Sequence, residues 1–283
     1  MTTHTALRHQ ALAVSGFGPM LREWRRVRGR SQLDLSLSCG VSQRHLSFLE
    51  SGRSRPSRDI VLYLASALDV PLHQQNAMLL SAGFAPGYRE RAMDAPDMRS
   101  IDRAIEQLLQ RQAPYPAIVV DQGYDIIRAN AVVGTLLAFL MGPEVAATAE
   151  PPPMNAIEIL LRPKGLRPLV ENWDEVASWS VRRLRAEATA EGPGGAAAVL
   201  LARILLLPGV AAIDRSPRPL EEPAPTLVLR LRRGDTRLAL FSIIATLGTP
   251  LDVTLQNLRL ELFFPADAQT GAWFERVAPA TLG

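Results

Sequence analysis

The chain contains 283 residues, of which 47% are hydrophobic and 21% are charged, a balance typical of folded globular proteins. Its single cysteine excludes an intramolecular disulfide framework. The sequence opens without the pattern of a signal peptide, and its most apolar stretch, residues 196–210, is too short to span a membrane and is interrupted by Arg203 and Pro208. We therefore expect a soluble, cytoplasmic protein with no membrane partner.

Length and an uneven distribution of charge predict a multi-domain protein. Residues 1–91 hold 12 arginines and 6 acidic residues, whereas the rest of the chain holds 19 basic and 22 acidic residues. A basic part joined to a slightly acidic part is typical of a phosphate-binding module attached to a domain with another task. We expect a mobile N-terminal arm over 1–15, an all-α domain over 16–84 and a linker over 85–97.

Five helices are expected in this all-α domain. Apolar residues recur at helical spacing over 17–28 and again after Ser57, where the serine hydroxyl can cap a helix. A further helix is expected to begin near Pro71, because proline suits a first turn, and to end at Gly83. Two shorter helices lie between the first and second of these.

The two shorter helices form a helix-turn-helix motif. Ser31 can cap a helix that Gly40 ends, and Ser42 can cap a second helix that Gly52 ends. In this motif the second helix enters the major groove of duplex DNA with its N-terminal residues. Cys39 falls where the two helices approach each other, which favours a buried small residue over a redox sensor.

Glutamines open both helices of the motif, and this pair resembles the phage-repressor (Xre) type of helix-turn-helix over roughly residues 17–83. The resemblance implies that the first glutamine holds a phosphate and braces the second against an adenine, and that arginines just past the second helix contact the backbone. An arginine at position 44 favours guanine. The alternative is that this polar face is only solvated surface. The residues expected at the DNA are Gln32, Gln43, Arg44, His45, Ser47, Arg53 and Arg55.

Beyond the linker, the pattern changes to mixed helix and strand. A helix over 99–112 is either a connector or a dimer seam. Short strands over 117–120 and 125–128 flank a turn, and Asn130 can cap the helix that follows. A strand, turn, strand and asparagine-capped helix is how a PAS-type sensor domain begins.

The remaining sequence continues this mixed pattern. The helices expected here cover 155–161, 172–190 and 196–207, the proline-rich loop covers 208–225, and the strands cover 227–232, 237–247 and 258–264. A hairpin turn at Gly234 joins the first two strands. We therefore expect an α+β, PAS-like domain with an antiparallel sheet over 98–270, followed by a C-terminal tail over 271–283.

Three strings in this half carry a resemblance to a known family. YPAIVVD, GLRPLVENWDEV and IATLGTPLDVTLQNLRLELFFPAD resemble the ligand-binding domain of MmyB-like transcription regulators, which carry a helix-turn-helix before it. The resemblance implies a PAS-like sheet flanked by helices, with a cavity between them that suits a long-chain fatty acid in at least part of the family. Segments 146–153 and 192–198 depart from the family pattern, and we expect them at the pocket mouth.

The distribution of histidine and cysteine argues against catalysis. His4, His9, His45, His73 and Cys39 all precede the linker, so the C-terminal half lacks the usual zinc ligands and the common pairs of nucleophile and base. We expect no enzyme, no metal site and no cofactor other than a bound fatty acid or similar apolar ligand.

Three functional hypotheses follow. The first is a transcription regulator that responds to a small apolar ligand, the second is a DNA-binding protein whose C-terminal domain only dimerises or docks a protein partner, and the third is an enzyme with an attached DNA-binding domain. The absence of C-terminal histidines disfavours the third. The expected DNA partner is an inverted-repeat operator bound by a homodimer, because one recognition helix covers only a few base pairs.

Apolar positions on the strands and helices around the expected gap are candidates for the pocket, although each could equally belong to the core. If the ligand is a fatty acid, Asn130, Arg182 or Thr246 is expected to meet its carboxylate. The candidate ligand-binding residues are Val119, Ile127, Asn130, Leu137, Leu140, Trp173, Val176, Phe241, Ile243 and Phe263.

Overall fold

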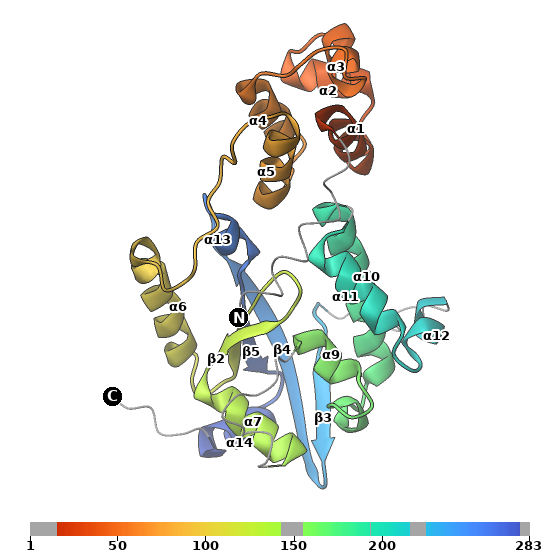
Figure 1. The fold of residues 1–283 in the computed structure, drawn as a ribbon. Coiled ribbons are helices and arrows are strands. Elements are labelled where there is room, and N and C mark those ends of the chain that lie inside the picture. Colours follow the sequence, from red (N-terminus) through yellow and green to blue (C-terminus); the bar gives the residue numbers. More distant parts are fainter. Residues whose placement is uncertain (1–15, 143–154, 193, 216–224, 278–283) are drawn as a thin grey trace. The chain divides into compact units, whose positions relative to one another are not determined.

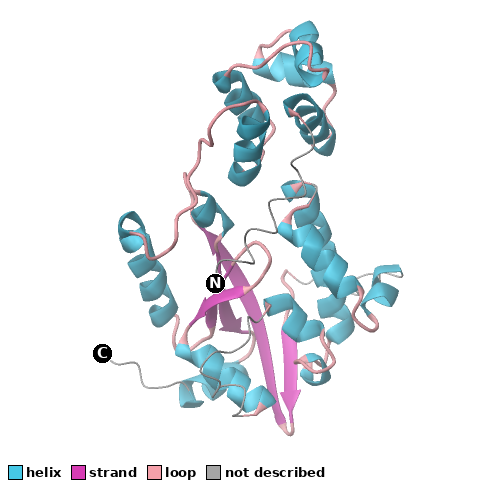
Figure 2. Cartoon of the chain, in the orientation of Figure 1, coloured by secondary structure: helices cyan, strands magenta, loops and turns pink. Residues whose placement is uncertain are grey.

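The computed structural model describes residues 16–142, 155–192, 194–215 and 225–277. The expected arm over 1–15 and the expected pocket-mouth segment 146–153 lie outside these residues. The chain divides into two compact units, of which the first contains residues up to Arg91 with the short segments 188–195 and 250–256, and the second contains the rest. Figure 2 shows that the strands belong to the second unit, whereas the first is built from helices and loops.

The first unit has the five helices that the sequence predicts in residues 16–84 (Figure 1). Serine hydroxyls cap three of them, because Ser31, Ser42 and Ser57 each accept a hydrogen bond from the backbone amide three residues further on. Gly40 ends the second helix with a φ of 61°, a conformation that favours glycine. The helices are α1 (Phe17–Val27), α2 (Gln32–Cys39), α3 (Gln43–Glu50), α4 (Arg58–Ala67) and α5 (Leu72–Ser81).

One apolar core holds these helices together. Leu21, Leu35, Leu46 and Leu64 come from four different helices and are fully buried in it. Cys39 is buried in the same cluster, as expected for a small residue at a close helix contact. The core fixes the angle between α2 and α3 and thereby determines which side chains of α3 remain on the surface.

The strands of the second unit form one antiparallel sheet in the order β2-β1-β5-β4-β3 within the described residues. The predicted hairpin between β3 and β4 is confirmed: Gly234 has a φ of 58° in a two-residue turn. The first and last strands of the domain, β1 and β5, lie side by side, which the sequence pattern did not reveal. The strands are β1 (Ala117–Val120), β2 (Ile126–Ala129), β3 (Leu229–Arg233), β4 (Thr236–Thr246) and β5 (Arg259–Pro265).

Helices lie around this sheet (Figure 1). Apolar side chains of α7, α10, α14 and the sheet pack into one core cluster that includes Val132, Val176, Leu231 and Phe274. The predicted α+β domain with an antiparallel sheet is therefore confirmed. The helices and helical turns after the first unit's α5 are η2 (Pro96–Met98), α6 (Arg99–Arg111), α7 (Ala131–Met141), α9 (Ala156–Leu161), η3 (Arg167–Leu169), α10 (Trp173–Glu191), α11 (Ala196–Leu205), α12 (Val210–Arg215), α13 (Val253–Asn257) and α14 (Ala268–Val277).

Three local expectations differ from the structure. The segment 208–225, expected as a loop, contains α12 before it leaves the described residues. The expected boundary at residue 270 falls inside α14, where Trp273 and Phe274 are buried, so the domain continues to Val277. Asn130 begins α7, but its side chain makes no capping bond and instead accepts from the backbone amide of Ala117.

No helix in the described part of the chain combines the length and hydrophobicity needed to cross a membrane.

Candidate DNA interface and ligand cavity

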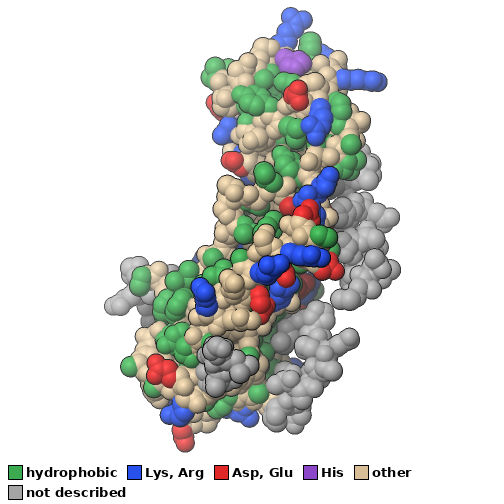
Figure 3. Space-filling model, turned by 90° about the vertical axis from the view of Figure 1, so that its left-hand side faces the viewer, with side chains coloured by type: hydrophobic (Ala, Val, Ile, Leu, Met, Phe, Trp, Pro, Cys, Tyr) green, Lys and Arg blue, Asp and Glu red, His purple; other side chains and the backbone are tan. Residues whose placement is uncertain are grey.

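The recognition helix α3 presents a polar face because its apolar residues are committed to the core. Leu46 and Leu49 are buried, which leaves Gln43 and Arg44 exposed and His45 half-buried. Ser47 is half-buried on the same helix, while Arg53 and Arg55 are exposed just beyond it. Basic side chains project from the surface of this unit in the upper part of Figure 3. The residues expected at DNA therefore lie where solvent, or a phosphate backbone, can reach them.

Phe48, which sequence reasoning missed, organises two of these arginines. The guanidinium of Arg44 lies 5.3 Å from the centre of the Phe48 ring, and that of Arg53 lies 5.9 Å from it. Both distances suit a cation–π contact. The available signal was the spacing, since residues four apart on a helix are neighbours. The ring restrains one arginine expected to read bases and one expected to contact the backbone.

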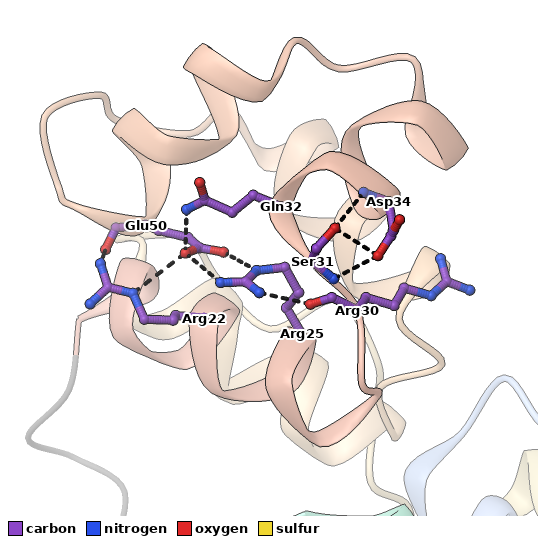
Figure 4. Close-up of polar contacts among 7 residues, drawn as sticks. All are labelled: Arg22, Arg25, Arg30, Ser31, Gln32, Asp34 and Glu50. Atoms are coloured by element: carbon purple, nitrogen blue, oxygen red, sulfur yellow. Dashed lines mark hydrogen bonds and ion pairs between the residues drawn. The ribbon is translucent and has the colours of Figure 1, made fainter.

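At the end of the recognition helix, the Glu50 carboxylate contacts three side chains from α1 and α2 (Figure 4). Arg25 Nε donates to Glu50 Oε1 at 2.6 Å, and Gln32 Nε2 donates to Oε2 at 2.8 Å. Arg22 Nε lies 3.4 Å from Oε2. The carboxylate side chain is only 1% exposed. This network joins α1 to the start of α2 and to the end of α3, the two helices of the motif.

The charge of Glu50 survives its burial. Burial by itself would raise the pKa of this carboxyl, but the hydrogen bonds from Arg25 and Gln32, together with the positive charges, lower it below its ordinary value. Gln32 is thus fixed to an ionised partner. No hydrogen bond joins Gln32 to Gln43 among the described residues, so the bracing role remains a prediction.

A cavity of about 330 Å³ lies in the second unit between α9, α10 and one face of the sheet. Its volume is at the lower end of the range for small-molecule sites, and its lining is predominantly apolar, as in such sites. The lining residues are Tyr124, Ala156, Ile157, Leu160, Val176, Trp179, Ser180, Arg183, Pro225, Thr226, Leu227, Leu229, Leu240, Phe241, Ser242, Ile244, Glu261 and Phe263.

Three of the residues expected at the pocket, Val176, Phe241 and Phe263, border this cavity. The other seven lie elsewhere. Ile127 and Ile243 are 47% and 51% exposed. The remaining five have structural surroundings: Val119, Leu137 and Leu140 are buried in the packed core, Asn130 bonds to three backbone groups, and Trp173 lies under the guanidinium of Arg167.

Strand register explains several of these differences. Ser242 pairs with Phe263 and Ile244 pairs with Glu261, so all four side chains share the sheet face toward the cavity. Ile243 lies between Ser242 and Ile244 along β4 and points to the opposite face. An error of one residue exchanges the two faces of a strand. A shift of one residue also separates prediction from structure on α10: Arg182, expected to meet a ligand carboxylate, is exposed, and its neighbour Arg183 lines the cavity.

Two polar lining residues, Tyr124 and Arg183, belong to a connected charged cluster. Arg183 Nε donates to Glu187 Oε1 at 2.9 Å, and Arg259 Nη1 donates to Glu187 Oε2 at 2.8 Å. The Tyr124 hydroxyl donates to Glu187 Oε1 at 2.8 Å. Burial would raise the pKa of Glu187, but these bonds, above all those from Arg259, lower it. Burial raises the pKa of the Tyr124 hydroxyl, so the phenol stays protonated as a donor.

The described residues contain no group of three or more histidine, cysteine or acidic side chains placed to hold a metal ion. What the structure does present is an exposed basic helix-turn-helix in one unit and a largely apolar cavity in the other. Together these features define a DNA-binding protein with a ligand-binding domain.

Comparison with known families agrees with this class. The helix-turn-helix family profile matches residues 21–74, and the profile of the MmyB-like transcription regulator ligand binding domain matches residues 101–277, which is more than half of the chain. The chain belongs to the MmyB-like transcription regulators. Neither matched family is a family of enzymes. A comparison with curated proteins gave no match.

Proposed function

We propose that this regulator binds an inverted-repeat operator as a homodimer, and that a small apolar ligand of the long-chain fatty acid class, held in the cavity of the second unit, changes its affinity for that operator. The observation that carries the proposal is the cavity itself, which a domain used only for dimerisation would have no reason to keep. Its apolar part is formed by side chains from the sheet and from α9 and α10, including Leu160, Val176, Leu229 and Leu240.

An acyl chain would gain binding energy from this lining. Each buried methylene contributes roughly 0.8 kcal/mol, so a chain of about 12 to 16 carbons reaches micromolar affinity even if only part of it is enclosed. The effect on DNA requires that the ligand bind two arrangements of the protein with different affinities, because equal binding to both shifts nothing.

The DNA interface supports the dimer. A single α3 helix offers a few side chains to the bases, and the surrounding arginines make a limited number of phosphate contacts. Two such helices held in one particle gain affinity through the high effective concentration of the second site. A two-fold symmetric protein then requires a two-fold symmetric operator.

A pair of neighbouring substitutions tests the ligand part of the proposal. Ile244→Trp places a larger side chain on the cavity face of β4, whereas Ile243→Trp places it on the opposite, half-exposed face. Operator affinity of the full-length protein is measured by fluorescence anisotropy with and without tetradecanoate. We expect wild type and Ile243→Trp to respond to the ligand, and Ile244→Trp to bind DNA without responding.

Lipid extraction of the purified protein followed by mass spectrometry provides an independent measurement. A bound long-chain acid supports the proposal. If no lipid is released, and if tetradecanoate changes operator affinity in none of the three proteins, the C-terminal domain serves dimerisation or partner docking instead.

A further inference from the structure

The cavity has an apolar end and a polar end, and two elements run between them in the same direction. Along α10, Val176 is followed two turns later by Arg183. Along β4, Leu240 is followed by Ser242 and then by Ile244, which pairs with Glu261. Glu261 of β5 lies opposite the end of this run, beside the charged cluster of Arg183 and its partners. A bound amphiphile would therefore place its head group at the Glu261 end.

Among the described residues, Glu261 is the acidic side chain that lines the cavity. Its Oε1 accepts a hydrogen bond from the Ser242 hydroxyl at 2.7 Å. The charged and titratable groups that face it are Arg183 and Glu187 from α10, Arg259 from its own strand, and Tyr124 from the turn between β1 and β2.

Two arginines flank Glu187 at this end of the cavity. Both oxygens of Glu187 are engaged by Arg183, Arg259 and Tyr124, and these contacts keep this carboxylate ionised. Burial raises the pKa of Glu261 in spite of the two arginines.

A carboxylate head group beside Glu261 would bring two carboxyl groups into one buried site. Two negative charges within hydrogen-bond distance of each other in a buried site repel strongly, and such pairs of carboxyl groups hold one proton between them. A shared proton turns the repulsion into a charge-assisted hydrogen bond, while the positive charge of Arg183 stabilises the single negative charge that remains.

We propose, on the basis of the ligand site proposed above, that Glu261 recognises the head group of a carboxylic acid ligand as a protonated carboxyl, which donates a hydrogen bond to the ligand carboxylate beside Arg183. The proton comes from solvent. Glu261 is in this view a specificity-determining residue: it couples ligand binding to the uptake of one proton.

This coupling has a measurable consequence. Once pH exceeds the pKa of Glu261 in the free protein, each further pH unit costs about tenfold in affinity for a carboxylate ligand, because binding must first protonate Glu261. A fatty alcohol of the same chain length brings no second negative charge, so its affinity should change less than about threefold over the same range.

The experiment is isothermal titration calorimetry of full-length protein with tetradecanoate and with tetradecanol between pH 6 and pH 9, where a carboxyl with an ordinary pKa of about 4.3 is ionised throughout. For wild type we expect the affinity for the acid to fall with pH and the affinity for the alcohol to stay level. Repeating the acid titration in buffers of different ionisation enthalpy at the alkaline end should reveal the uptake of about one proton.

Glu261→Gln supplies a permanent hydrogen-bond donor of nearly the same shape. We expect this variant to bind tetradecanoate more tightly than wild type at pH 9, with a level pH profile. The matched control, Glu275→Gln, changes an exposed glutamate on α14 and should keep the wild-type profile.

The possible failures are separable. If neither probe binds wild type, the ligand function itself is wrong, and the role of Glu261 falls with it. If tetradecanoate binds with a level pH profile and without proton uptake, or if Glu261→Gln retains the wild-type slope, the cavity holds acids but Glu261 does not share a proton with them. The calorimetric proton count uses wild type alone, so it decides the matter even if the variant fails to fold.

Discussion

Replacing Glu50 by glutamine should destabilise the helix-turn-helix unit severely, although the substitution removes one charge and almost no volume. The Glu50 side chain is 1% exposed and the Arg25 side chain 11%, so the variant leaves a buried guanidinium without its counter-charge. Breaking a buried pair in this way costs about 3 to 5 kcal/mol. Arg22 is 43% exposed, and its pair adds at most about 1 kcal/mol.

Because the amide of glutamine keeps one acceptor for Arg25, we expect the lower end of this range, about 3 kcal/mol. Hydrogen exchange of the backbone amides of α1 and α3 in full-length protein, measured by mass spectrometry, reports the free energy of opening of this unit. A loss of about 3 kcal/mol accelerates exchange by more than about 100-fold. Glu23→Gln makes the same chemical change at an exposed position of α1 and should leave exchange within about twofold of wild type.

The pH dependence gives the same network a second signature. The pKa of Glu50 is lower in the folded protein than its ordinary value of 4.5. Its contribution is therefore fully present above about pH 4.5 and is lost as pH falls toward the folded-state pKa. The difference in stability between wild type and Glu50→Gln should shrink over that acidic interval. Equal protection of wild type, Glu50→Gln and Glu23→Gln at neutral pH would refute the assignment of Glu50 as the buried anchor of the motif.

Three further predictions concern the remaining elements. Gly18→Ala should lower the free energy of unfolding by about 2 kcal/mol or more, because the added Cβ would lie 2.6 Å from the carbonyl oxygen of Leu49. Gly134→Ala on α7 is the control: its Cβ would meet nothing within 4 Å, so this substitution should stabilise the protein by about 0.5 to 1 kcal/mol. Equal effects of the two substitutions would contradict the close contact of α1 with α3. Arg44→Ala should relax specificity at one position of each half-site, with a loss of about 1 to 3 kcal/mol per bidentate contact, and an unchanged selected site would exclude it as a base reader. Arg53→Ala should instead weaken binding to all sequences alike and reduce the salt dependence of affinity, as measured by titrations at several salt concentrations.

The local signals in the sequence determined most of the first unit. Capping serines, glycines at helix ends and apolar spacing act over a few residues, and Ser31, Ser42 and Ser57 do cap helices in the structure. The same signals revealed that Gln43 and Arg44 belong to an exposed face. They did not reveal the role of Glu50, because an acidic residue at the end of an amphipathic helix usually faces solvent. Its burial depends on Arg25 and Arg22, which precede it by 25 and 28 positions in the chain.

In the second unit, by contrast, the sequence did not determine which residues line the cavity. The sequence located its strands within a few residues, and the family strings predicted the kind of domain, but the pocket residues depend on which face of each strand meets α10. The pairing of β1 with β5 and of β5 with β4 makes that choice. The β1–β5 pair joins residues that are more than 100 positions apart in the chain. A shift of one residue exchanges the faces. Alternation along β4 is compatible with either Ile243 or Ile244 facing the cavity, and the Arg183–Glu187–Arg259 cluster exists only because distant elements meet. The sequence by itself therefore determined the secondary-structure elements and the class of the protein, because caps, turns and spacing are local. Only the tertiary structure decided the lining of the cavity and the position of Glu261 within it, because both depend on long-range pairing.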